Sequence, residues 1–173
     1  NLKKLTLNFS ETVNASLLSV GAITLQNAAT ATASYTLTNS TTASANGTAI
    51  IINLSATDFN AIAANANLAK AATSSYLRLT AATIKDLFGN SVTAIADGSA
   101  MLVTTYTADT TAPTLSSWTL NMNTHQLSLV FSESVKASTL AVGGITLQST
   151  GTGGTSYTLT NSTSESGNGT NIV

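Results

Sequence analysis

The stretch "LTLNFSETVNASLLSVGAITLQ" (residues 5–26) is nearly repeated as "LSLVFSESVKASTLAVGGITLQ" (residues 127–148), 122 positions further along the chain. Aligning residues 1–51 with residues 123–173 needs no gap and gives 30 identical pairs. This offset is longer than the repeat of a solenoid, which has about 20–50 residues. It matches the length of an independently folding domain, typically about 100–150 residues. The sequence therefore predicts a tandem array of similar domains.

The only proline, Pro113, marks the predicted joint between the two copies. It ends the polar segment "TADTTAP", and proline stiffens an extended linker because its ring fixes φ. We expect a first Ig-like domain over residues 1–106, a linker over 107–113 and the N-terminal part of a second repeat over 114–173. The first domain is expected to lack a counterpart of the strand that opens the second.

Apolar and polar residues alternate through much of both copies, and this two-residue period is typical of half-buried strands. In "LTLNF", Leu5, Leu7 and Phe9 fall on one face. Further short strands follow, separated by turns rich in Gly, Asn and Ser: "AITLQ", "SYTLTN", "TAIIINLS", "SYLRLTAATI" and "SAMLVTTYTA". Many short strands with regular turns predict an all-β fold, an Ig-like antiparallel β-sandwich.

The strand that opens the second copy interrupts this alternation. In "LSSWTLNM" (residues 115–122) the apolar residues Leu115, Trp118 and Leu120 are separated by three and then two positions. Since successive strand residues point to opposite faces, we expect that these three side chains do not share one face.

One alanine-rich stretch, "SATDFNAIAANANLAKAA" (residues 55–72), has the pattern of a helix instead. Its apolar residues recur at helical spacing: Phe59, Ile62, Ala63 and Ala66. Ser55 followed by Asp58 resembles a capping box at a helix start. We expect a short helix in the 56–70 region that crosses one end of the sandwich.

The composition excludes several classes of protein. The chain is 43% hydrophobic and 8% charged, with net charge −1, so it has enough apolar residues for a packed core. Its six basic residues are scattered, which makes nucleic acid a poor candidate partner. No apolar run approaches the roughly 20 residues that cross a bilayer, so we expect no membrane span. The absence of cysteine excludes disulfides and thiolate metal sites.

Ser, Thr and Asn supply the polar residues that charge does not, and they form seven Asn-X-Ser/Thr sequons. A chain rich in these residues also generates such triplets by chance. A neutral surface of this kind suits an extracellular or cell-surface protein that is glycosylated. The glycosylation candidates are Asn8, Asn14, Asn39, Asn46, Asn53, Asn161 and Asn168.

Three motifs, in order, give the chain a family resemblance. A D-x-T-A-P linker occupies residues 109–113, an L-x-F-S-E-x-V strand occupies 7–13 and again 129–135, and an I-x-D-x-x-G-N turn occupies 84–90. With "ITLQ" and "YLRLTAATIKDLFGN", these motifs resemble the bacterial Ig-like (Big-type) domains found in tandem on large surface proteins, adhesins and S-layer-type proteins. The resemblance implies a sandwich that serves as a spacer or building block and seldom as an enzyme.

Little in the sequence predicts catalysis. The single histidine, His125, corresponds to Lys3 in the first copy, which favours a polar turn position, and no Gly-x-Ser-x-Gly motif occurs. Glu11 and Glu133 occupy the same repeat position, a whole domain apart, so they cannot form one acid–base pair. We expect no enzymatic activity and no organic cofactor.

Two kinds of ligand remain open. Oxygen ligands from Asp86, Asn90, Asp97 and the linker residue Asp109 could bind Ca²⁺ where two domains join. The alternative is structural, since Asp and Asn side chains stabilise turns by accepting backbone N–H groups. Four aromatic residues could stack on sugars, although packing in the core is the interpretation we favour: Tyr35, Tyr76, Tyr106 and Trp118.

These patterns together predict a structural repeat unit of an extracellular filament, stalk or cell-surface appendage. The alternative is a passive spacer in a surface adhesin whose separate tip binds glycans or a host. In either case the predicted partners are other copies of the same unit. Neighbouring units would be joined by continuation of the chain or by strand donation between chains.

Overall fold

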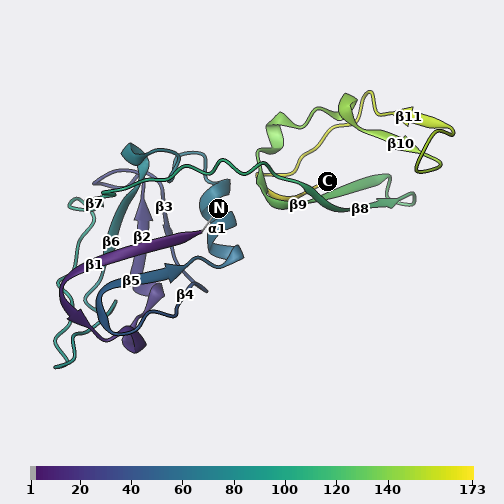
Figure 1. Ribbon diagram of the computed structural model, residues 1–173. Coiled ribbons are helices and arrows are strands. Elements are labelled where there is room, and N and C mark those ends of the chain that lie inside the picture. The colour runs from purple at the N-terminus through teal and green to yellow at the C-terminus, as the bar shows by residue number, and fades with distance from the viewer. Residues whose placement is uncertain (1–2) are drawn as a thin grey trace. The chain divides into compact units, whose positions relative to one another are not determined.

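The computed structural model describes residues 3–173, which form short antiparallel strands and one α-helix (Figure 1). The predicted all-β class with a single short helix is therefore confirmed. The chain divides into two compact units, Asn1–Ala112 (unit 1) and Pro113–Val173 (unit 2). Over residues 3–173, no helix combines the length and the apolar character needed to traverse a bilayer.

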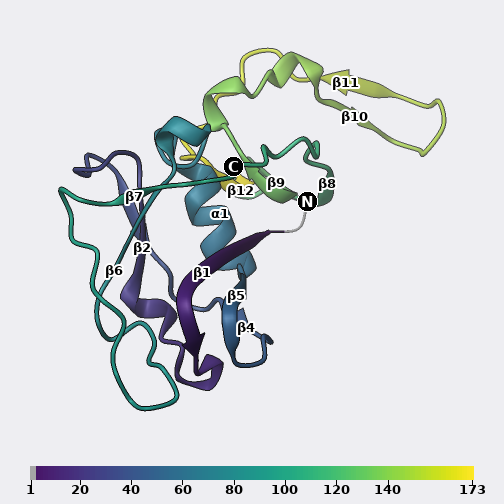
Figure 2. The ribbon, with the colours of Figure 1, turned by 60° about the vertical axis from the view of Figure 1, so that its left-hand side comes forward.

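Unit 1 contains two sheets, which Figure 2 shows as separate groups of strands. The first has the order β1-β5-β4, with β1 at Lys4–Val13, β5 at Gly47–Asn53 and β4 at Thr41–Thr42. The second has the order β3-β2-β6-β7, with β3 at Ser34–Thr36, β2 at Ile23–Gln26, β6 at Tyr76–Leu79 and β7 at Met101–Leu102. Short 3-10 helices occupy Ala15–Leu17, Val20–Ala22 and Ala72–Ser74.

One hydrophobic cluster draws on both sheets and on the helix of unit 1. Leu7 of β1 and Ile50 and Ile52 of β5 come from the first sheet, and Ile23 of β2 from the second. Leu5 and Phe9 pack against this cluster from the same face of β1 as Leu7, as the alternation predicted. Burial of such side chains contributes about 1.5–3 kcal/mol each, which makes this cluster the main stabilising feature of unit 1.

The helix α1 spans Ala56–Ala64 and ends earlier than the predicted 56–70 region. Ser55 caps it as expected, because its hydroxyl accepts the Asp58 N–H at 3.0 Å. The reciprocal half of a capping box is replaced by another contact, since the Ser55 N–H donates to the Ser40 hydroxyl. Beyond Asn65 the backbone turns, and Ala69 adopts φ of 52°. Asn65 itself is extended, with ψ of 115°, so the predicted short helix occupies the first part of the 56–70 region.

Unit 2 has a three-stranded sheet with the order β12-β9-β8 and a separate β10-β11 pair. The first comprises β12 at Gly169–Ile172, β9 at Gln126–Val135 and β8 at Leu115–Asn121. The pair comprises β10 at Thr146–Gln148 and β11 at Ser156–Thr158. Two 3-10 helices lie at Ala137–Thr139 and Val142–Gly144.

Equivalent residues of the two copies pair in the same register. Leu7 lies opposite Ile50, and 122 positions later Leu129 lies opposite Ile172. The β2–β3 and β10–β11 pairs also correspond. The hydroxyl groups of Thr24 and Thr36 are 2.9 Å apart, and those of Thr146 and Thr158 are 2.8 Å apart. The sequence repeat thus coincides with repeated strand pairing.

The opening strand of unit 2 contains a β-bulge that the sequence did not indicate. Leu115 lies opposite Phe131 and Ser117 opposite Val130, so Ser116 is an extra residue. The extra residue restores the alternation, and the expectation that Leu115, Trp118 and Leu120 do not share a face was wrong. Their directly opposite partners on β9 are Phe131, Leu129 and Leu127.

Candidate functional site

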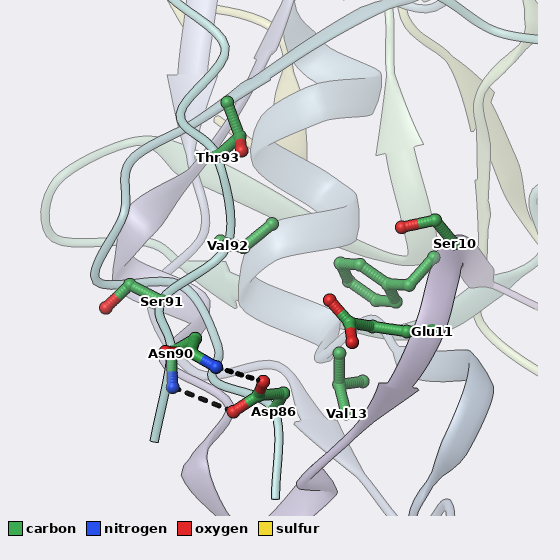
Figure 3. A pocket seen from close by; sticks show the side chains of 9 residues that line it. Ser10, Glu11, Val13, Asp86, Asn90, Ser91, Val92 and Thr93 are labelled. Carbon is green, nitrogen blue, oxygen red and sulfur yellow. Dashed lines mark hydrogen bonds between the residues drawn. The ribbon is translucent and has the colours of Figure 1, made fainter. Parts of the chain in front are cut away.

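A cavity of about 180 Å³ lies in unit 1 between the end of β1 and the segment that follows β6 (Figure 3). One wall is formed by Phe9, Ser10, Glu11 and Val13 of β1. The other wall is formed by Asp86 and residues 90–93. The cavity therefore combines apolar side chains with two carboxylates, and it includes two of the predicted calcium ligands.

Asp86 organises a tight turn at this cavity. One carboxylate oxygen accepts the backbone N–H groups of Phe88 at 2.8 Å and Asn90 at 2.7 Å, and the other accepts the Asn90 side-chain amide at 2.7 Å (Figure 3). The side-chain bond from Asn90, together with these backbone bonds, lowers the pKa of Asp86. Gly89 takes φ of 92°, which the turn requires. The structural interpretation of this motif is therefore confirmed.

The turn is anchored to β1. The Asn14 N–H donates to the Lys85 carbonyl at 2.8 Å, and Val13 and Asp86 form an antiparallel bridge. This anchoring leaves the tip of the turn in solvent, where the Phe88 side chain is 93% exposed.

The other predicted calcium ligands belong to different hydrogen-bond clusters. Asp97 accepts the Ala31 N–H at 2.9 Å and the Gln26 side-chain amide at 2.8 Å, and these bonds lower its pKa. Asp109 accepts the Thr111 N–H at 3.0 Å. Across residues 3–173, no three His, Cys, Asp or Glu side chains are grouped so that they could hold a metal ion. Calcium binding by Asp86, Asn90, Asp97 and Asp109 stays a prediction.

A second polar cluster, centred on Asp58 of α1, was missed by the sequence analysis. Its fully buried carboxylate accepts the Tyr35 hydroxyl at 2.9 Å and the N–H groups of Thr38, Asn39 and Ser40 at 2.9–3.1 Å. The hydroxyls of Thr38 and Ser40 also donate, at 2.6 and 2.5 Å. Burial alone would raise the pKa of Asp58, but the bonds from Ser40, Thr38 and Tyr35 outweigh burial and hold it well below its usual range.

One feature of the sequence could have indicated this cluster: the segment "SYTLTNST" recurs unchanged at residues 34–41 and 156–163. In unit 1 that segment contains the groups that donate hydrogen bonds to Asp58, which belong to Tyr35 and to residues 38–40. Its counterpart in unit 2 is largely exposed, and Tyr157 has 62% of its surface in solvent.

The predicted glycosylation sites differ in how their side chains are engaged. Asn46 accepts the Ala15 N–H at 3.0 Å, and its repeat equivalent Asn168 accepts the Ala137 N–H at 3.1 Å. Asn14 caps the first 3-10 helix by accepting the Ser16 N–H. Four others lie at exposed positions: Asn8, Asn39, Asn53 and Asn161. Glycosylation at all seven stays a prediction.

The histidine and the aromatic residues considered as catalytic or sugar-binding candidates lie in different parts of the chain. His125 lies in the turn between β8 and β9 with φ of 55°, as expected for a polar turn residue. The Tyr106 hydroxyl donates to the Ala69 carbonyl at 2.9 Å, and Tyr76 lies in β6. Trp118 in β8 is 53% exposed. These aromatic residues therefore belong to different elements.

Comparisons of the chain with protein-family models, with curated proteins and with solved structures find no match.

Proposed function

We propose that the chain is a structural repeat unit of an extracellular filament, stalk or cell-surface appendage, built from tandem Ig-like β-sandwich domains. The observation that carries the proposal is the common register of the two copies, in which Leu7 and Ile50 pair as Leu129 and Ile172 do. Such repetition of strand pairing is what successive units of one array require. The surface rich in Ser, Thr and Asn and the resemblance to Ig-like surface domains also support it.

The first sheet of unit 1 suits a unit that carries tension. Residues 4–8 of β1 pair antiparallel with β5 without interruption, and β4 extends the sheet on the far side of β5. A force along the strands therefore acts on several backbone hydrogen bonds at once. Asp58 connects α1 to β3 through one hydrogen bond and to the loop after β3 through five more. In this proposal the function of the chain is to remain folded under mechanical tension.

The test is immunogold electron microscopy with an antibody raised against the purified chain. On the cells that make the protein, we expect gold particles along extracellular filaments or stalks. Label confined to a stalk below a distinct tip would assign the chain to the spacer of an adhesin. Label inside the cell would contradict the proposal.

A further inference from the structure

Each copy contains one Asn-Gly-Thr sequon, which begins at Asn46 in the first copy and at Asn168 in the second. The asparagine has the same contact in both. The side-chain oxygen of Asn46 accepts the Ala15 N–H at 3.0 Å. The side-chain oxygen of Asn168 accepts the Ala137 N–H at 3.1 Å. Because the oxygen of each amide group is held in this way, the orientation of the amide nitrogen is fixed as well.

The fold accounts for the asparagine of this triplet but not for the two residues after it. Gly47 and Gly169 have φ values outside the left-handed region, and a Cβ added to either would meet no atom within 4 Å. The Thr48 side chain is exposed, and its hydroxyl makes no hydrogen bond within residues 3–173. Packing therefore does not explain why glycine and threonine recur here, whereas an N-glycosylation sequon requires the threonine.

The triplet lies at an irregular part of the sheet in both copies. The register of β1 with β5 shifts between Asn8 and Val13, and Val13 lies opposite Gly47. In unit 2 the corresponding shift falls between Gly169 and Asn171. The threonine of each triplet thus lies in a stretch where the regular ladder is interrupted. A modifying enzyme can reach such a stretch with less disruption of strand pairing than the middle of a strand.

The other sequon that recurs in both copies is held more tightly. In unit 1 it begins at Asn39, and the N–H groups of Asn39 and Ser40 donate to the buried Asp58 carboxylate at 3.1 and 2.9 Å. The Ser40 hydroxyl donates to the same carboxylate. An enzyme that drew this triplet into its active site would break these buried hydrogen bonds, so the folded chain offers Asn46 more readily.

The remaining sequons of unit 1 are also engaged in the fold. Asn8 and Asn53 belong to the paired residues of β1 and β5. In the sequon that begins at Asn14, the Ser16 hydroxyl donates to the Asn14 side-chain oxygen at 2.7 Å. The Asn-Gly-Thr triplet therefore differs from the others in combining an exposed asparagine, an unengaged threonine hydroxyl and recurrence in both copies.

We propose that Asn46 and Asn168 carry N-linked glycans, one at the same position of each unit. In this modification the Nδ2 atom of asparagine attacks the anomeric carbon of a lipid-diphosphate-linked oligosaccharide. The new N–C bond replaces the bond from that carbon to the diphosphate, which leaves with the lipid, and Nδ2 loses one proton. The hydrogen bond from the Ala15 N–H is retained, because the glycan is attached to the other polar atom of the amide group.

This inference rests on the proposed function and adds a periodic modification to the same repeat unit. Only 8% of the residues are charged, and successive triplets are 122 residues apart. A glycan at each of them would hydrate the array at regular intervals and supply the polar surface that charged side chains do not.

Glycopeptide mass spectrometry of the protein purified from the cells that make it tests the assignment. We expect a glycan mass on the peptides that contain Asn46 and Asn168, and none on the peptides that contain the other five sequons. Unmodified peptides at both positions, or equal occupancy at all seven sequons, would overturn the proposal.

Substitutions in the first triplet separate the modification from the fold. Thr48→Val removes a hydroxyl that makes no hydrogen bond in the folded chain, and we expect loss of the glycan from Asn46. Thr48→Ser keeps the sequon and should keep the glycan. Asn46→Asp retains an acceptor for the Ala15 N–H but has no Nδ2, so it should also lack the glycan. A glycan that persists at Asn46 in Thr48→Val would contradict the proposal.

The glycan and the filament are tested independently. Immunogold labelling with an antibody against the chain reports where the protein is, whether or not the protein is glycosylated. Labelled filaments whose Asn46 and Asn168 peptides are unmodified would overturn this inference and leave the proposed function standing. Glycosylated protein found away from filaments and stalks would do the reverse.

Discussion

Asp58 connects three segments of unit 1 through one buried carboxylate. It belongs to the first turn of α1, yet its hydrogen-bond donors come from β3 and from residues 38–40 of the following loop. The sequence indicated Ser55 as a helix cap because that contact is local. It did not indicate the partners of Asp58, since they lie about twenty positions away and meet it only when the sheet and the helix pack together.

Replacing Asp58 should destabilise unit 1 strongly. In Asp58→Asn the amide group replaces one acceptor oxygen and faces N–H donors, so buried donors of Thr38 or Ser40 lose their acceptor. We expect a loss of about 3 kcal/mol in the free energy of unfolding, measured by urea denaturation. Asp109→Asn is the matched control, because Asp109 lies at an exposed position and its carboxylate accepts the Thr111 N–H. That variant should change stability by less than about 0.5 kcal/mol. Equal effects of the two substitutions would contradict this role for Asp58.

Three hydrogen-bonded aspartate side chains make the stability of unit 1 depend on pH. Hydrogen bonds lower the pKa values of Asp58, Asp86 and Asp97 in the folded state. The unfolded chain therefore takes up protons first as the pH falls through the ordinary aspartate value of about 3.9. The stabilisation is fully present above that value and is lost progressively below it. Urea midpoints should be constant from about pH 5 to 8 and fall toward pH 3, with a smaller fall in Asp58→Asn. A midpoint that rises on acidification would contradict the assignment.

The strand pairs β2–β3 and β10–β11 share a register but differ in burial. Thr24 is 4% exposed and hydrogen-bonds to Thr36, whereas the equivalent Thr146 lies in solvent and hydrogen-bonds to Thr158. Alternation in the sequence located both pairs correctly because it depends on local spacing. It could not distinguish their burial, which depends on the elements packed against each pair.

This contrast makes a paired prediction. Thr36→Val leaves the buried Thr24 hydroxyl without its hydrogen-bond partner, and we expect a loss of about 1–2 kcal/mol. Thr158→Val removes the equivalent bond where water can replace it, so we expect a loss below about 0.5 kcal/mol. The two unfolding free energies, measured on single variants of residues 1–173, check the difference. A larger effect at Thr158 would show that the burial is wrongly assigned.

Two further elements show where sequence patterns fail. The helix pattern continued past Ala64 because alanine favours helices, but the backbone leaves the helical region before Ala69. In β8, one inserted residue, Ser116, realigned Leu115 with Trp118 and Leu120. Each difference is set by the backbone conformation at one or a few positions. Composition and periodicity are properties of longer segments, so they do not reveal it.

The chain as a whole consists of two units joined by an exposed segment. Residues 107–113 are all exposed, and Thr114 begins the contacts of unit 2 through its hydrogen bonds with Ser132. The repeat offset was evident in the sequence because 30 of 51 aligned residues are identical. The cavity beside Phe9 was not evident, since it depends on how β1 and residues 86–93 pack together.

Limited proteolysis checks this division. Exposed segments with few contacts are the preferred sites of cleavage, so a nonspecific protease should cut first within residues 107–113. Mass spectrometry of the earliest products should give a fragment ending in that segment. First cuts within β1 or β5 would contradict the existence of a compact unit 1.

The central claim is that one domain recurs along a load-bearing filament, and image reconstruction of the labelled appendage by cryo-electron microscopy tests it most directly. The account predicts successive domains, one for every 122 residues, in which residues 5–26 and 127–148 superpose and Leu7–Ile50 and Leu129–Ile172 occupy equivalent positions. A reconstruction in which these two segments adopt different folds would contradict it.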